Sequence, residues 1–142
     1  MEIEKNCTLS EAESDVLARA IAYVLLEKKA QDVRIYNVSE DSSVTNFYVN
    51  ATGRSSTNVG ALADEVTYKI GLSGRDELRV EGRSANSWLL IDYGDVIVNI
   101  FDRESREFYN FDRLLPEDSR VDVSDIIDEL DKKYDINNKK EN

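Results

Sequence analysis

The sequence predicts an α/β fold, with a mixed five-stranded sheet and helices packed on it. Two segments space their apolar residues as one face of a helix, and five shorter segments are rich in the branched and aromatic side chains typical of strands. The chain has 142 residues, of which 41% are hydrophobic, enough to bury the core of one domain. The expected order of elements is helix, strand, strand, helix and three strands.

The first helix is expected to begin at Ser10 and to end near Lys29. Ser10 and Glu13 have the spacing of a capping box, in which the hydroxyl and the carboxylate each accept an unpaired backbone N–H. The positive charge of Lys29 suits the negative end of the helix dipole. Apolar residues recur along one helical face between these ends: Leu17, Ala20, Ile21, Val24 and Leu25.

Two strands are expected after this helix, at residues 33–38 and 46–52. The polar cluster at residues 39–43 separates them and predicts a turn. Side chains alternate between the two faces of a strand, so the apolar residues of the second strand share one face. These residues are Phe47, Val49 and Ala51.

A turn at residues 53–57 leads into a second helix, which Ser56 or Thr57 is expected to cap and Gly71 to end. A glycine- and serine-containing turn between a strand and a helix also has the position of a phosphate-binding loop. It lacks the lysine and the glycine spacing of the known nucleotide-binding loops, so capping is the simpler explanation. The buried side of this helix is expected to carry Val59, Leu62, Ala63 and Val66.

The remaining strands are expected at residues 77–81, 88–92 and 95–101. Tyr93 and Gly94 separate the last two strands, and a two-residue link containing glycine is typical of a tight hairpin. This register predicts that three residue pairs face each other on one side of the sheet. The pairs are Trp88 with Asn99, Leu90 with Ile97 and Asp92 with Asp95.

The C-terminal part of the chain is expected to form an acidic tail. Residues 103–106 are typical of a turn, after which residues 107–115 return across the body, and Pro116 marks a boundary. We therefore divide the chain into a domain at residues 1–115 and a tail at residues 116–142 that is partly helical or disordered. One side of a short tail helix is expected to carry Ile126, Leu130 and Tyr134.

Composition excludes several classes of function. Asp and Glu number 29 against 18 Lys and Arg, and the resulting net charge of -11 repels phosphate backbones and anionic lipids. The absence of histidine removes Ser-His-Asp and Cys-His catalytic sites and zinc sites built on imidazole. The single cysteine, Cys7, makes neither an internal disulfide nor a cysteine-only metal cage. With no apolar segment long enough to span a membrane and no signal-like N-terminus, we expect a cytoplasmic protein.

Two features near the hairpin are candidates for function. Asp92 and Asp95 could hold magnesium and, with the turn at residues 53–56, would suggest a nucleotidyl-transfer enzyme. Acidic residues flanking a glycine turn are also ordinary turn chemistry, which is the simpler explanation. Trp88, the single tryptophan, is either a core residue whose indole N–H needs a buried partner or an anchor of a binding surface, and both interpretations stay open.

A longer pattern resembles the ribosomal silencing factor family, also called RsfS or Iojap. It comprises DSSVTNFYVNATGRSSTNVGALADEV, then EG, then WLLIDYGDVIVNIF and REFYNFDRLLP, and it covers roughly residues 10–116. The segment W-x-x-x-D-x-G-D-V-x-V, from Trp88 to Val98, is its most specific part.

This resemblance implies a small α/β domain related in topology to nucleotidyltransferases but without their activity. It implies no catalytic residue, metal or cofactor, and a protein that binds the large-subunit ribosomal protein L-fourteen and blocks joining of the small subunit. The partner-binding residues it implies are Trp88, Asp92, Tyr93, Asp95 and Asn99. Asn99 departs from the family, whose members commonly have histidine there; asparagine keeps a donor and an acceptor but not the titratable ring.

Alternatives remain within and outside this family. An assembly factor for the large ribosomal subunit would use the same contact, and a magnesium-dependent nucleotidyltransferase-like enzyme is the alternative from another class. The resemblance is also compatible with a homodimer, for which the apolar hairpin would supply a surface. The acidic charge fits a basic ribosomal protein better than bare nucleic acid, because complementary charge speeds association and disfavours wrong partners.

Overall fold

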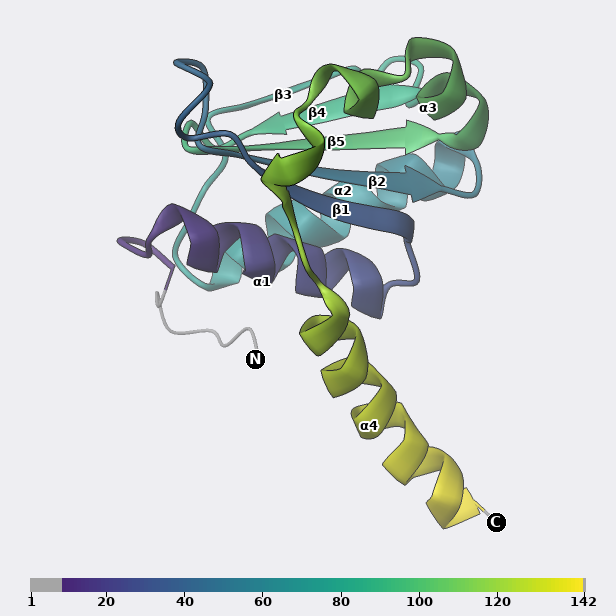
Figure 1. Cartoon of the computed structure of the whole chain (residues 1–142). Coiled ribbons are helices and arrows are strands. Elements are labelled where there is room, and N and C mark those ends of the chain that lie inside the picture. Colours follow the sequence, from purple (N-terminus) through teal and green to yellow (C-terminus); the bar gives the residue numbers. More distant parts are fainter. Residues whose placement is uncertain (1–8, 142) are drawn as a thin grey trace.

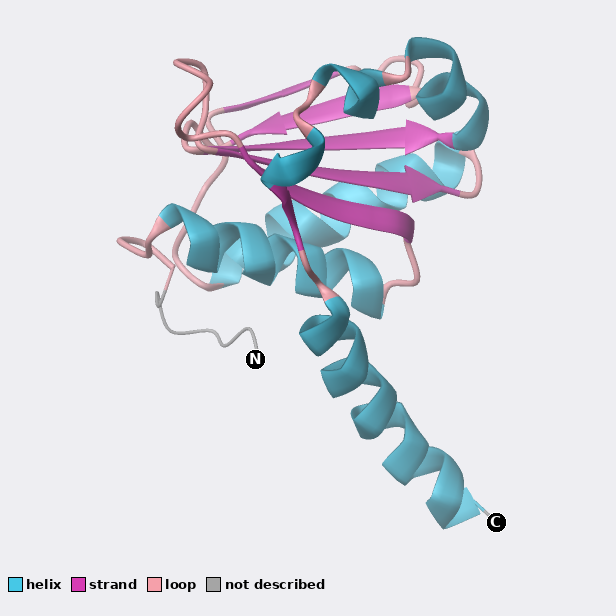
Figure 2. Cartoon of the chain, viewed as in Figure 1, coloured by secondary structure: helices cyan, strands magenta, loops and turns pink. Residues whose placement is uncertain are grey.

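The computed structural model describes residues 9–141, and Cys7 lies outside them. A mixed sheet with the strand order β3-β4-β5-β2-β1-β6 forms the centre of the molecule (Figure 1). Two long helices, α1 (Ser14–Glu27) and α2 (Ser56–Leu72), cover one face of this sheet (Figure 2). The strands are β1 (Gln31–Asn37), β2 (Phe47–Gly53), β3 (Arg79–Glu81), β4 (Trp88–Asp92), β5 (Val96–Asp102) and β6 (Arg120–Val121).

The α/β class is confirmed, but the sheet has six strands rather than the five predicted. The additional strand, β6, pairs antiparallel with β1 through Val121 opposite Ile35 and Arg120 opposite Tyr36. Two residues are too few to give an alternating pattern in the sequence, so this strand had no signal of its own. Strands β2 and β5 are parallel, and every other neighbouring pair in the sheet is antiparallel.

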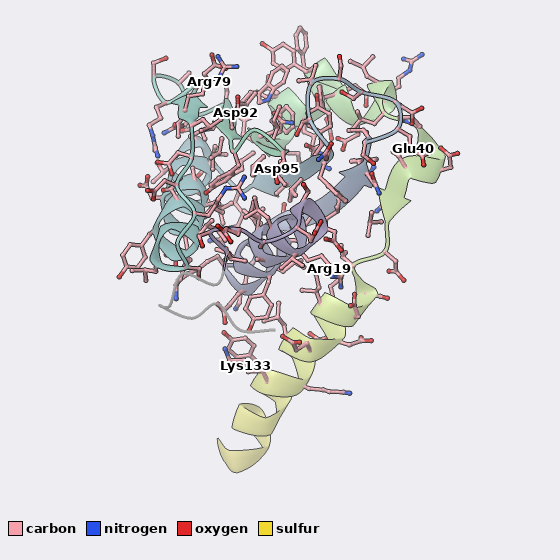
Figure 3. The ribbon with its side chains drawn as sticks, turned by 90° about the vertical axis from the view of Figure 1, so that its left-hand side faces the viewer. Arg19, Glu40, Arg79, Asp92, Asp95 and Lys133 are labelled. Atoms are coloured by element: carbon pink, nitrogen blue, oxygen red, sulfur yellow. The ribbon has the colours of Figure 1, made fainter. Side chains whose placement is uncertain are left out.

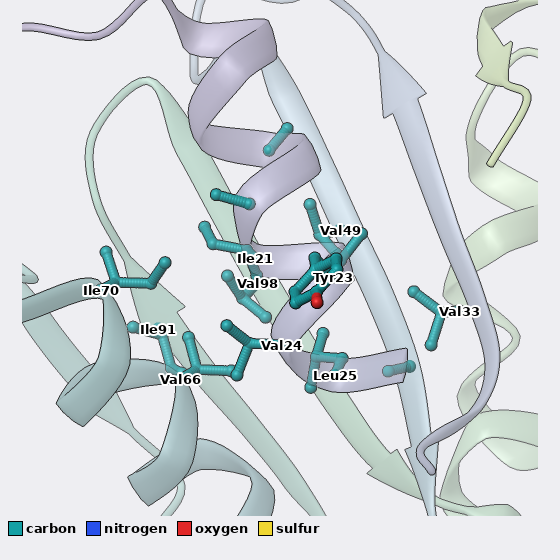
Figure 4. Packing of buried hydrophobic residues seen from close by; sticks show 14 of the residues in the cluster. Ile21, Tyr23, Val24, Leu25, Val33, Val49, Val66, Ile70, Ile91 and Val98 are labelled. Carbon is teal, nitrogen blue, oxygen red and sulfur yellow. The ribbon is translucent and has the colours of Figure 1, made fainter. Parts of the chain in front are cut away.

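The apolar stripes predicted for both helices are confirmed, and they form the core between the helices and the sheet (Figure 4). Ile21 and Leu25 of α1 and Val66 of α2 are completely buried. They pack with the inward-facing side chains of the strands, among them Val49 of β2 and Val98 of β5. This layer fixes which face of the sheet is left free of the two long helices.

The predicted helix ends are wrong by a few residues. Helix α1 begins at Ser14 with Glu13 as its N-cap, so Ser10 lies in the preceding turn and does not form the expected capping box. Helix α2 is capped by Ser55, whose Oγ accepts a hydrogen bond of 3.1 Å from the backbone N–H of Asn58. Its C-cap is Ser73 rather than Gly71. Local hydroxyl groups compete for the same capping role, and the backbone geometry selects one of them.

The hairpin between β4 and β5 has a register two residues away from the predicted one. Trp88 lies opposite Phe101, Leu90 opposite Asn99 and Asp92 opposite Ile97. The Tyr93 N–H donates to the Val96 carbonyl at 2.9 Å, so the two turn residues are Gly94 and Asp95. Gly94 has φ of 88°, and a glycine at the first turn position supplies this positive φ without strain.

Residues 103–106 form part of a helix instead of the predicted turn. Helix α3 (Arg103–Tyr109) is capped by Asp102, whose side chain accepts from the Ser105 N–H at 2.7 Å. The short 3-10 helix η1 (Phe111–Leu114) follows it, and a second one, η2 (Glu117–Ser119), precedes β6. We call residues 103–115 the α3–η1 segment. It lies on the side of the sheet opposite α1 and α2 (Figure 1).

The tail is attached to the same sheet and the same core as the rest of the molecule. After β6, helix α4 (Ser124–Glu141) packs its first turns on α1 and then extends away from the body (Figure 1). Ile126 and Leu130 are buried as predicted, whereas Tyr134 is half exposed and its hydroxyl donates to Glu27. Within residues 9–141, no helix is long and apolar enough to cross a membrane.

Candidate functional site

The face of the sheet opposite α1 and α2 carries the candidate site, and we call it the outer face. Side chains alternate along a strand, so Trp88, Leu90 and Asp92 of β4 point to this face together with Asn99 and Phe101 of β5. The α3–η1 segment covers the part over β5 and β2. Within the described residues, α3 makes no comparable contact with β4 or β3, and Trp88 of β4, which packs against Tyr109, lies at the border between the two parts.

An aromatic cluster surrounds Trp88 at this border. Its ring centroid lies 5.0 Å from that of Phe101, 4.9 Å from that of Tyr109 and 5.9 Å from that of Phe111. These separations are those of favourable aromatic pairs. The indole is only partly buried, so Trp88 is at once a packed residue and a surface residue. The packing expected of a core residue is therefore found in part, and the role of Trp88 as an anchor of a binding surface stays a prediction.

A buried polar chain begins at the indole nitrogen. Trp88 Nε1–H donates to Asn99 Oδ1 at 3.0 Å, and Asn99 Nδ2 donates to Asn50 Oδ1, also at 3.0 Å. Asn50 Nδ2 in turn donates to Asp112 Oδ1 at 2.9 Å. Asn99 is 1% exposed and Asn50 is fully buried, so each amide depends on these partners in place of water. Asn99 is therefore an internal support of Trp88, and its side chain offers almost no surface.

Asp112 ends this chain beneath the α3–η1 segment, where it pairs with Arg106. Arg106 Nε donates to Asp112 Oδ2 at 3.0 Å, and the arginine side chain is 9% exposed. Burial alone would raise the pKa of Asp112, but hydrogen bonds from Asn50 and Arg106 outweigh it and hold the pKa below the usual aspartate range. The carboxylate is consequently ionised at neutral pH.

Tyr93 does not lie on the outer face. It points to the opposite side of the hairpin, into the core beneath α1 and α2, and is 2% exposed. Burial, reinforced by the nearby charge of Glu77, raises the pKa of its hydroxyl. Among the described residues this hydroxyl has no hydrogen-bond partner. Its inclusion among the partner-binding residues is therefore revised: the side chain offers no surface to a partner.

The two aspartates of the hairpin are paired within the molecule, and Figure 3 labels both of them together with Arg79. Asp92 accepts from Arg79 Nε at 3.2 Å and from the Gly94 N–H at 2.7 Å. Asp95 pairs with Arg75 and accepts from Ser14 Oγ at 2.8 Å. These internal contacts weaken the prediction that both carboxylates meet basic groups of a partner. Exposed acidic residues beside the outer face are instead found on α3, at Glu104 and Glu107.

The parts of the predicted nucleotidyl-transfer site are not brought together. The hairpin turn lies at the Phe47 end of β2, whereas Gly53 and Arg54 lie at the other end, a separation of roughly 20 Å along a seven-residue strand. The Arg54 N–H and the Ser55 hydroxyl both bond to Asn58 as capping groups. Within the described part of the chain, no three His, Cys, Asp or Glu side chains gather as ligands for a metal.

Sequence reasoning missed the apolar side chains of the α3–η1 segment. Phe108 is 79% exposed, Leu114 is 76% exposed and Tyr109 is 51% exposed. Phe108 packs edge-on against Tyr109, which packs against Trp88, so these rings continue the surface of the hairpin. The available signal was the density of aromatic residues between 108 and 111. This density does not indicate a surface beside Trp88 until α3 is known to lie against the sheet.

Comparison with known proteins identifies the relatives of this chain. Residues 11–142 match the family model described as ribosomal silencing factor during starvation, RsfS, and so include the tail that the sequence resemblance left out. The ribosomal silencing factor RsfS of Halalkalibacterium halodurans is 32% identical over 101 residues, covering 71% of this chain and 86% of that protein.

Two solved structures are also similar. A Chromobacterium violaceum protein superposes with a TM-score of 0.71 at 29% identity, covering 73% of this chain and 87% of the other. A Bacillus halodurans protein superposes with a TM-score of 0.65 at 32% identity, covering 78% and 99%.

Proposed function

This chain belongs to the RsfS family of ribosomal silencing factors, and from that premise we propose that its outer face binds the large-subunit ribosomal protein L-fourteen and so blocks joining of the small subunit. The observation that carries the proposal is the half-buried Trp88 at the border of the part of the sheet that the α3–η1 segment covers, continued by exposed Tyr109 and Phe108. Blocking of this kind needs occupancy of a surface and no chemical step.

The composition of this surface supports a protein partner. Tryptophan and tyrosine are enriched where binding energy concentrates, because large rigid rings exclude water from a contact with little loss of conformational freedom. A specific contact of standard size covers about 800 Å² on each partner, which one face of a small sheet can supply. Trp88 and its neighbours would form the centre of such a contact.

Charge supports a basic partner. The chain carries a net charge of -11, and Glu104 and Glu107 stand exposed on α3 beside the aromatic residues. Acidic groups at the rim of a contact raise the association rate with a basic protein and lower it with nucleic acid. The proposal places this activity in the cytoplasm, where the ribosomal subunits join.

Sedimentation of purified ribosomal subunits tests the proposal. An excess of the protein should shift joined ribosomes to separate subunits and should itself sediment with the large one. Leu90→Asp places a charge in the apolar centre of the proposed contact and should weaken this binding at least about tenfold, because removing a charge from water costs free energy. Tyr68→Asp is the matched control, since Tyr68 is 62% exposed on α2, the helix layer on the other side of the sheet.

Three outcomes would contradict the proposal. Subunits that still join at saturating protein would remove the blocking role, and equal binding by both aspartate variants would remove the outer face as the contact. Association confined to immature large subunits would favour the assembly factor over the silencer. A homodimer that uses the outer face cannot bind the large subunit through the same face. In analytical ultracentrifugation, adding large subunits should therefore reduce the amount of dimer.

A further inference from the structure

The polar chain from Trp88 to Asp112 has a direction. Each of its two amides accepts on the side of Trp88 and donates on the side of Asp112: Asn99 accepts from the indole and donates to Asn50, and Asn50 donates to the carboxylate. The three donor–acceptor distances are 3.0, 3.0 and 2.9 Å, so every link is a well-formed hydrogen bond.

The two ends of the chain determine this direction. An indole N–H donates only, and an ionised carboxylate accepts only. With a carboxylate at position 112, Asn50 turns its NH2 group toward it and its oxygen toward Asn99. Asn99 then turns its own oxygen toward Trp88. If Asn50 were reversed, Asn99 would present its NH2 group to the indole N–H, and two donors would face each other in a buried site.

Arg106 holds the carboxylate that starts this order. Its Nε and Nη2 donate to the two oxygens of Asp112 at 3.0 and 3.3 Å. Its Nη1 donates to Thr52 Oγ1 at 2.9 Å and to the Asp32 carbonyl at 2.7 Å, so the guanidinium is itself fixed to β2 and β1. A two-point contact of this kind sets both the position and the orientation of the carboxylate.

We propose that Asp112, fixed by Arg106, is a positioning residue that orients Trp88 for partner binding through the buried amides of Asn50 and Asn99. This role rests on the proposed function, in which Trp88 contacts the partner. Asp112 itself lies about three hydrogen bonds from the indole and makes its contribution without touching the partner. A ring held at its nitrogen in the free protein loses less freedom on binding than a loose one.

Nuclear magnetic resonance on the free, full-length chain tests the positioning role directly. Trp88 is the single tryptophan, so the indole N–H gives one assignable signal. In Asp112→Asn one of the two acceptor oxygens becomes an NH2 group that must face a donor of Arg106 or of Asn50. This variant should therefore shift the indole signal and speed its exchange with solvent about tenfold, the effect of one hydrogen bond. Asp118→Asn removes the same charge from an exposed position six residues on and should leave the indole signal unchanged.

The pattern of change separates positioning from a general loss of stability. A positioning role predicts that the indole exchanges faster while backbone amides of the core strand β5 keep their protection. An unchanged indole signal in Asp112→Asn, or equal acceleration of all amides, would overturn the proposal. If Asp112→Asn does not fold, the unaltered chain supplies the test: the side-chain amide protons of Asn99 should show stronger nuclear Overhauser contacts to Asn50 than to the indole proton, and the reverse order would overturn the proposal.

Binding to purified large subunits supplies the second arm. Asp112→Asn should bind about tenfold more weakly than Asp118→Asn, in proportion to the loosening of the indole. Equal binding by the two variants, with a loosened indole, would overturn the link between orientation and binding. If Trp88→Ala binds as well as the unaltered chain, the proposed contact of Trp88 with the partner is wrong. The indole signals of the unaltered chain and of Asp112→Asn still test the positioning role in that case.

Discussion

Replacing Tyr93 by phenylalanine should stabilise this protein. Tyr93 is 2% exposed, and its hydroxyl has no hydrogen-bond partner among the described residues. An unpaired buried hydroxyl costs about 1–3 kcal/mol in comparisons of protein variants, and phenylalanine fills nearly the same space without it. We expect a gain of at least about 1 kcal/mol in the free energy of unfolding, or about 4 °C in Tm for a chain of this size.

Tyr36→Phe is the matched control for this change. Tyr36 is also 2% exposed, but its hydroxyl accepts from Arg34 Nη1 at 3.4 Å and bonds to Asp112. Removing a hydroxyl that is bonded to charged groups should cost about 1.5 kcal/mol. Urea denaturation should therefore show a higher free energy of unfolding for Tyr93→Phe than for the unaltered chain, and a lower one for Tyr36→Phe.

The dependence of stability on alkaline pH is a second test of the burial of the Tyr93 hydroxyl. Burial raises the pKa of Tyr93 in the folded chain above its ordinary value of 10.0, which applies to the unfolded chain. At a pH between the unfolded and the folded pKa, the folded chain therefore holds a proton that the unfolded chain has lost. The native state therefore loses stability as pH rises above about 10, by at most about 1.4 kcal/mol per pH unit for one group. Tyr93→Phe should flatten this decline.

A destabilised Tyr93→Phe at neutral pH would refute the reasoning, because it would mean that the hydroxyl has a partner such as a bound water. If the gain in the free energy of unfolding of Tyr93→Phe over the unaltered chain stays constant above pH 10, the raised pKa does not belong to Tyr93. Since Tyr93 is buried on the helix side of the sheet, this variant should bind large subunits like the unaltered chain.

Three further changes test other parts of the structure. Gly82→Ala should destabilise by more than about 1 kcal/mol in thermal melting, because Gly82 has φ of +93° and an added Cβ would lie 2.2 Å from the Trp88 carbonyl oxygen. Leu130→Ala should cost about 2–4 kcal/mol and release α4 from α1, seen as faster amide exchange in α4 alone. Acid titration should show a contribution from Asp112 that is present above the ordinary aspartate pKa of about 3.9 and lost as pH falls through its lower folded value. Asp112→Asn should lack that part of the acid transition.

The position of each predicted site residue shows where sequence reasoning stopped. Trp88 and Asn99 were expected to face each other, and they are hydrogen-bonded although the strand register differs by two residues. A shift of two residues keeps every side chain on its own face of the sheet, whereas a shift of one would have reversed them all. The outer face was therefore predictable from the sequence even though the turn was misplaced by one residue.

Other features had no local signal. The ion pairs of Asp92 with Arg79 and of Asp95 with Arg75 depend on the course of residues 74–79 beside the hairpin, which no periodicity indicates. Helix α3 is seven residues long, and this is too short for its residue spacing to distinguish it from the turn that was predicted at residues 103–106. Strand β6 is shorter still and exists because β1 has a free edge for it.

The sequence by itself determined the α/β class, the two buried helix stripes, the family and the face on which Trp88 lies, because these depend on residue spacing along one strand or helix. The tertiary structure decided which polar groups are buried and with whom they pair. Asn50, Asn99, Arg106 and Asp112 come from four separate elements, and a polar side chain is stable in the interior only where the fold brings it a partner.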